Sequence, residues 1–96
     1  MKMKMFEVGK KYETWVTGAE SEMLRYEIEI ISRGPERLFA NVKVEETDTN
    51  YCYYWPISEI AADINVGYNK YADFQYEYIT FKTLRKITIR ANYEVL

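Results

Sequence analysis

Residues 24–32 read LRYEIEIIS, and this stretch decides the fold class. Apolar residues alternate with charged ones along it: Leu24, Tyr26, Ile28 and Ile30 against Arg25, Glu27 and Glu29. A period of two is typical of a β-strand with one face in the core and one in solvent. We therefore predict a strand here, with the apolar set facing inward.

The sequence on either side repeats this pattern. Gly34 and Pro35 predict a turn, because glycine permits positive φ and proline fixes φ. Residues 38–44 then alternate again, which predicts a hairpin with the first strand. Further strands are expected at residues 12–17, 51–55, 74–81 and 86–95, the second of them ended by Pro56, which cannot donate to a ladder.

One segment suggests a helix instead. Ser58 is a suitable N-cap, and Gly67 a suitable stop. Between them the apolar residues recur at helical spacing: Ile57, Ile60, Ala61 and Ile64. We predict one short helix, or a 3₁₀ turn, here, followed by an irregular region over residues 65–73.

Together these elements predict a mainly β, single domain over residues 1–96. About six strands separated by turn signals are typical of a small antiparallel barrel or sandwich. An SH3-like or OB-like barrel with one short helix is the expected architecture.

The residue types that carry most enzyme chemistry are scarce. The chain has no histidine and one cysteine, Cys52, which removes the commonest general base and the usual zinc ligands. A calcium loop starting at Asp48 fails, because Tyr53 stands where a glycine is needed. We expect no catalysis, no metal and no cofactor. A lone cysteine and no apolar leader favour a cytoplasmic protein.

The middle of the chain is both acidic and aromatic. Residues 45–81 hold seven carboxylates against one cation, Lys70, and ten of the sixteen aromatic residues. A small domain cannot bury so many rings from one stretch, so some should lie at the surface. Tyrosine and tryptophan are favoured in protein interfaces, which predicts a partner-binding surface here.

Alternation places Tyr53 and Tyr54 on opposite faces of their strand, so one should be core and one exposed. The predicted partner-binding residues are the following: Glu45, Glu46, Asp48, Tyr51, Tyr53, Tyr54, Asp73 and Tyr76.

Both ends of the chain are basic. Their cations are Lys2, Lys4, Lys10, Lys11, Lys82, Arg85, Lys86 and Arg90. If the terminal strands pair, these residues form a patch beside exposed rings, as in single-strand nucleic-acid binders. The acidic middle opposes that reading, since phosphate binding needs a positive footprint. Nucleic-acid binding therefore stays an alternative, as does a self-associating structural protein or homo-oligomer.

Three short segments resemble small uncharacterised accessory proteins of bacterial mobile elements. They are the F-x-V-G-K-x-Y opening at Phe6–Tyr12, the strand from Tyr26 to Arg33, and the R-K-I of Arg85–Ile87. The resemblance implies a phage or plasmid origin and no known activity. Such proteins are often similar to inhibitors of host nucleic-acid enzymes, including anti-CRISPR proteins that present carboxylates in place of phosphates. The expected function is therefore a non-enzymatic protein-binding module, in its most specific form an inhibitor that blocks a basic groove on a host nuclease.

Overall fold

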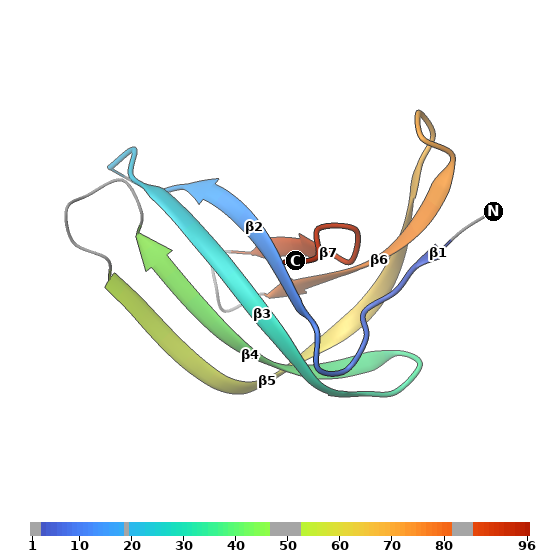
Figure 1. The fold of residues 1–96 in the computed structure, drawn as a ribbon, viewed down its shortest axis with the longest axis horizontal. Helices are drawn as coiled ribbons and strands as arrows, with labels where there is room; N and C mark the ends of the chain where they lie inside the picture. Colours follow the sequence, from blue (N-terminus) through green and yellow to red (C-terminus); the bar gives the residue numbers. More distant parts are fainter. Residues whose placement is uncertain (1–2, 19, 47–52, 82–85) are drawn as a thin grey trace.

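The described strands pair into one curled sheet that forms a half-barrel (Figure 1). The computed structural model describes residues 3–18, 20–46, 53–81 and 86–96, with residues 53–58 by backbone only. The strands are β1 (Met3–Lys4), β2 (Lys11–Thr17), β3 (Met23–Arg33), β4 (Arg37–Glu46), β5 (Tyr53–Asn69), β6 (Phe74–Phe81) and β7 (Ile87–Arg90).

Strand β5 joins the two halves of the sheet. The strand order is β1-β6-β5-β4-β3-β2, and β7 lies beside β6 on the same edge as β1. The first part of β5 pairs with β4 and its last part with β6. The chain end then returns to β2: Glu13 N donates to Tyr93 O (3.0 Å) and Val95 N to Lys11 O (2.8 Å). Among the residues described, no helix is long and apolar enough to cross a lipid bilayer.

The alternating segments fold as their pattern predicts. In β3, Leu24, Tyr26, Ile28 and Ile30 are all buried, and β3 forms an antiparallel hairpin with β4. Each such side chain contributes about 1.5–3 kcal/mol on burial. The predicted strands at residues 12–17 and 74–81 are also present, as β2 and β6. The mainly β, small-barrel prediction is therefore confirmed.

The predicted helix is wrong, because residues 58–67 lie within β5. Ala62 is buried while Ala61 and Asp63 are exposed, which is strand alternation. A β-bulge at Glu59 (φ 55°) explains the misleading spacing. The register places Ile57 opposite Val42 and Ile60 opposite Ala40, so one extra residue puts positions three apart on the same face. Residues 65–69, expected to be irregular, are also strand.

Pro56 does not end the strand as predicted. The β5 pairing with β6 begins only at Ile64, so β5 pairs with β4 alone around Pro56. Proline is tolerated in such an edge position because it need not donate to a second neighbour. Tyr51 and Cys52, the start of the predicted strand, lie outside the described residues.

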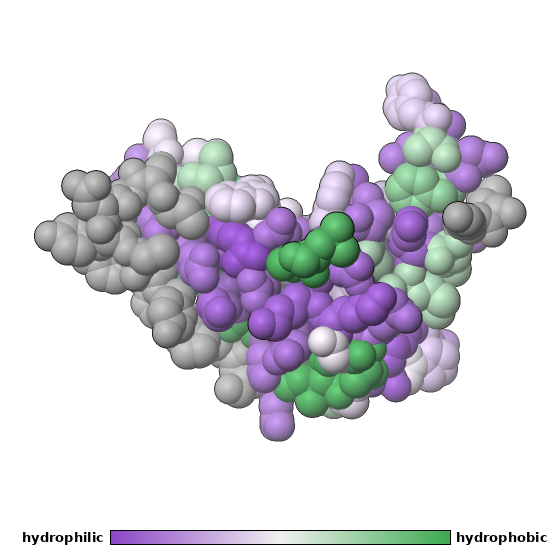
Figure 2. All heavy atoms as spheres, in the orientation of Figure 1, coloured by the Kyte–Doolittle hydropathy of each residue, from purple (hydrophilic) through white to green (hydrophobic). Residues whose placement is uncertain are grey.

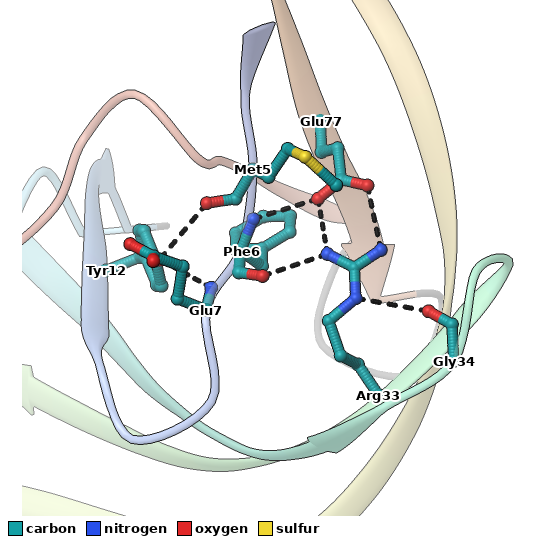
Figure 3. A network of polar contacts seen from close by, with 7 residues as sticks. All are labelled: Met5, Phe6, Glu7, Tyr12, Arg33, Gly34 and Glu77. Atoms are coloured by element: carbon teal, nitrogen blue, oxygen red, sulfur yellow. Dashed lines mark hydrogen bonds and ion pairs between the residues drawn. The ribbon is translucent and has the colours of Figure 1, made fainter.

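A buried ion pair crosses one end of the barrel (Figure 3). Arg33, at the end of β3, meets Glu77 in β6 through two contacts, Nη1–Oε1 at 2.6 Å and Nη2–Oε2 at 2.9 Å. Phe6 completes the network: its N–H donates to Glu77 Oε1 (2.8 Å), and its carbonyl accepts from Arg33 Nη1 (2.9 Å). The Glu77 residue is only 3% exposed. The network therefore fastens the N-terminal segment to two strands that are not neighbours in the sheet.

Tyr12 holds the same segment from the other side. Its hydroxyl accepts from Glu7 N (2.8 Å) and donates to Met5 O (3.3 Å). Its ring meets Phe6 edge-on, with centroids 4.9 Å apart. Burial raises the pKa of Tyr12 above its ordinary value, because the phenolate is poorly solvated there.

We predict that removing either partner of the Arg33–Glu77 pair destabilises the fold. Arg33→Ala should lower the free energy of unfolding by about 3–5 kcal/mol, because the Glu77 charge stays buried without its counter-ion. Glu77→Ala should cost less, because the Arg33 side chain is 16% exposed and solvent partly compensates its charge. Urea denaturation monitored by circular dichroism measures this loss.

The exposed pair between Arg37 and Asp63 (3.2 Å) is the matched control. Asp63→Ala should cost less than about 1 kcal/mol, since solvent screens that pair. Arg33→Met combined with Glu77→Leu should be less destabilising than either single change to alanine. Equal losses for Glu77→Ala and Asp63→Ala would contradict the role given to the buried pair.

We predict that the contribution of Tyr12 to the stability of the fold is lost in alkali. A raised folded-state pKa means that its contribution is complete below the ordinary pKa of about 10 and is lost as pH rises through the folded value. At pH 7, Tyr12→Phe should cost about 0.5–1.5 kcal/mol, the value of a typical hydrogen bond. Above pH 10 that difference should shrink. Denaturation of both proteins from pH 7 to alkaline pH tests this, and a difference that stays constant would refute it.

Candidate partner-binding surface

The end of β5 and the start of β6 form a hairpin that extends beyond the barrel (Figure 1). We call residues 65–78 the arm. Cross-strand pairs lie on the same face of a sheet, so the register defines two faces. The inner face continues from the core and carries Val66, Tyr68, Gln75 and Glu77; the outer face carries Asn65, Gly67, Asn69, Phe74, Tyr76 and Tyr78.

A row of rings packs on the outer face. Tyr76 lies between Phe74 and Tyr78, with both centroid separations 6.1 Å, and the Arg90 guanidinium lies 5.3 Å from the Tyr76 ring centroid. The Tyr76 ring also covers Gly67, where an added Cβ would lie 2.6 Å from Tyr76 Cζ. These three rings are half-buried. They stabilise the arm where no core supports it.

The inner face carries apolar side chains that the described structure covers only in part. Val66 is 52% exposed and Tyr68 51%. Met3 lies opposite Gln75 in β1, on the same face, and is 37% exposed; Met5 is 50% exposed. Figure 2 shows apolar residues along the arm and a hollow between the arm and the rest of the molecule. We call Met3, Met5, Val66 and Tyr68 the inner arm surface.

The arm ends in a tightly bonded turn. Asn69 Oδ1 accepts from the backbone N–H of Tyr71 (3.0 Å) and of Ala72 (3.1 Å). The Tyr68 hydroxyl donates to Asp73 Oδ1 (2.7 Å), a bond that raises the pKa of Tyr68. Tyr71 is 91% exposed, with the Lys70 ammonium 5.3 Å from its ring centroid. The turn thus fixes Tyr68 and presents Tyr71 to solvent.

A second polar cluster, which we call the Arg25 cluster, lies on the outside of β2, β3 and β4. Arg25 meets three carboxylates: Glu13 at 2.6 Å, Glu27 at 2.6 Å and Glu45 at 3.6 Å. Trp15 lies opposite Arg25 in the register and is half exposed. The cluster therefore places three carboxylates, one of which (Glu27) also contacts Lys11 at 3.7 Å, beside an exposed ring.

The predicted site residues fall into two groups rather than one. Asp73 and Tyr76 belong to the arm. Glu45 belongs to the Arg25 cluster, and Glu46 lies beside it at the end of β4, half-buried. The backbone positions of Tyr53 and Tyr54 lie opposite Glu46 and Glu45, but their side chains, like all of Asp48 and Tyr51, lie outside the described part.

The basic ends do not form one patch among the described residues. Lys10 pairs with Glu7 (2.6 Å) and Glu94 (3.1 Å), and Lys11 with Glu27 (3.7 Å). Lys4 and Arg90 do flank the outer rings of β6, since β1 and β7 share its edge. Lys2, Lys82 and Arg85 lie outside the described residues.

Sequence reasoning missed three exposed apolar residues of the two candidate surfaces, Val66 and Tyr68 in the arm and Trp15 in β2. The signal for the first two was the alternation of Ile64, Val66 and Tyr68, which the helix prediction concealed. In the described ranges, no group of three or more His, Cys, Asp or Glu residues is arranged to hold a metal ion. No protein-family model, curated protein or solved structure matches this chain, so function is inferred from its own residues.

Proposed function

We propose that this chain is a non-enzymatic protein-binding module that grips its partner with the inner arm surface. Methionine and tyrosine are enriched where proteins meet. Tyrosine supplies large contact area with few rotatable bonds, which makes it a frequent hot spot. The inner arm surface combines these residue types on one face of one hairpin.

The contrast between the two faces of the arm carries the proposal. The outer rings are packed together and half-buried, so they account for the stability of the arm. The inner Val66 and Tyr68 are about half exposed and add little to that stability. Their positions are nevertheless well fixed, because Tyr68 is bonded to Asp73. A fixed apolar face outside the core is suited to binding another protein at low entropic cost.

The Arg25 cluster supports a second, narrower candidate. Three carboxylates contact Arg25 beside the half-exposed Trp15, and one of them, Glu27, also contacts Lys11. A surface where carboxylates lie beside an exposed ring suits a basic partner. A groove on a host nucleic-acid enzyme is such a partner, and an inhibitor from a mobile element is the corresponding role. Glu45 and Glu46 would then contribute to the contact together with Trp15.

Tyr68 tests the arm directly. Immobilised protein captures partners from a bacterial lysate, and the dissociation constant of each purified partner is then measured by surface plasmon resonance. Tyr68→Ala should weaken binding by about 1–3 kcal/mol, roughly 5- to 150-fold, mainly through faster dissociation.

Tyr93→Ala is the matched control, because Tyr93 is 50% exposed and lies outside the arm. It should bind the partner like the native chain. Thermal melts of both variants exclude misfolding. If Tyr68→Ala binds as tightly as Tyr93→Ala, the inner arm surface is not the interface. If Glu13→Gln and Trp15→Ala weaken binding instead, the Arg25 cluster is the interface.

Nucleic acid should bind poorly at physiological salt. Only Lys4 and Arg90 flank the outer rings within the described residues, whereas phosphate tracking usually needs many cations. Fluorescence anisotropy with single- and double-stranded oligonucleotides measures this. Sub-micromolar, salt-sensitive binding that is lost in Arg90→Ala would favour a single-strand binder that uses Phe74, Tyr76 and Tyr78 as its stacking platform.

A further inference from the structure

One edge of the arm has unpaired backbone groups. Residues Asn65–Asn69 of β5 pair with β6 on one side. On the other side, the β4 ladder stops at Asp63, and the last bond toward it runs from Ile64 N to Glu36 O (2.8 Å). Backbone groups alternate in direction along a strand. Val66 and Tyr68 therefore turn their N–H and C=O groups toward the same side as Ile64, where the described residues offer them no backbone partner.

This edge also lacks the usual protection. Natural sheet edges carry lysines, prolines, bulges or inward-pointing charges that prevent pairing with another chain. Residues 64–69 read INVGYN, without a charged residue or a proline. The bulge of β5 lies at Glu59, before this segment. The edge is a ready template for a further strand.

The sequence of the edge indicates which strand it fits. Around Gly67 it is nearly palindromic: Val66 and Tyr68 flank the glycine, and Asn65 and Asn69 flank that pair. Antiparallel pairing of this edge with the same edge of a second copy places Val66 opposite Tyr68 and Asn65 opposite Asn69. A twofold interface uses the same surface patch on both subunits, so it requires this self-complementarity. We propose that two copies of this chain associate through Asn65–Asn69, with the twofold axis at Gly67.

The pairing satisfies both the backbone and the side chains. Val66 exchanges backbone hydrogen bonds with Tyr68 of the second copy, and Tyr68 with the second Val66. The two glycines meet at the axis, where their lack of side chains lets the strands approach. On the inner face, Val66 packs against the second Tyr68, which covers side chains that are about half exposed in one copy. On the outer face, the Asn65 and Asn69 amides lie opposite each other and can hydrogen-bond.

The dimer goes beyond the proposed function and does not depend on it. It joins two inner arm surfaces side by side into one larger apolar face, which a partner protein can then contact. Self-association is measured on the purified chain without a partner. A negative result would therefore leave partner binding by the monomer unaffected.

Sedimentation equilibrium of the full chain tests the proposal. Between about 1 μM and 1 mM, the range in which modest interfaces associate, the apparent mass should rise from 11.5 kDa toward twice that value. Val66→Lys and Val66→Glu should each raise the dissociation constant about tenfold or more. In each variant, the two like charges at position 66 of the two copies lie diagonally across the twofold axis and repel each other. Mixing the two variants should restore association, because opposite charges then meet.

Val8→Lys is the matched control, since Val8 is a valine of similar exposure (57%) outside the arm. It should associate like the native chain. A native chain that stays monomeric up to 1 mM would overturn the proposal. So would association that Val66→Lys leaves unchanged, or a lysine–glutamate mixture that fails to associate, since each places any contact away from this edge.

Discussion

The buried pair of Arg33 and Glu77 determines where the barrel ends and the arm begins. Glu77 lies on the inner face of β6, directly opposite Val66, at the point where the apolar core stops. Toward the core, the same face carries Ile79 and Phe81, which are fully buried. Away from it, Gln75 is half-buried and Tyr68 is exposed. A buried carboxylate needs its counter-ion and several donors, and Arg33 and the Phe6 N–H supply them. The N-terminal segment therefore helps to stabilise the buried charge of Glu77.

The arm follows from this constraint. Beyond Glu77 the described residues form no core that would stabilise a two-stranded hairpin, and isolated hairpins are marginal in water. The rings of Phe74, Tyr76 and Tyr78 on the outer face compensate, with Tyr76 lying over Gly67 and under Arg90. Gly67 thus leaves room for the Tyr76 ring, which stabilises the arm. The inner face and the outward edge of β5 take no part in these ring contacts, and the contacts proposed above for other molecules lie there.

The sequence predicts the parts of the fold that depend on local alternation. The strand from Leu24 and its hairpin partner each have one consistently apolar face, so their inward sets can be read directly. In β6 the strand is predicted but its inward set is not, because Gln75 and Glu77 share the inner face with Ile79 and Phe81. The prediction failed in β5, where the Glu59 bulge moves Ile57 and Ile60 onto the register positions of one face and imitates a helix. The candidate site was harder still. Whether Val66 is core or surface depends on where the Arg33–Glu77 pair closes the barrel. That contact joins residues 44 positions apart in sequence, and no local pattern reveals it.

The same folding changes the meaning of the charge distribution. Along the sequence, basic ends flank an acidic middle, which suggests separate charged surfaces. In the folded chain, Lys10 meets Glu7 and Glu94, and Lys11 meets Glu27. Arg33 meets Glu77 from the acidic middle, so much of the segregation becomes local pairing. Even the three carboxylates around Arg25 are partly balanced, because Glu27 also meets Lys11, which leaves less charge for long-range steering. The contacts proposed for the arm depend instead on rings, methionines and backbone groups without a partner among the described residues. Such contacts act only at short range and favour a slowly dissociating complex over a rapidly formed one.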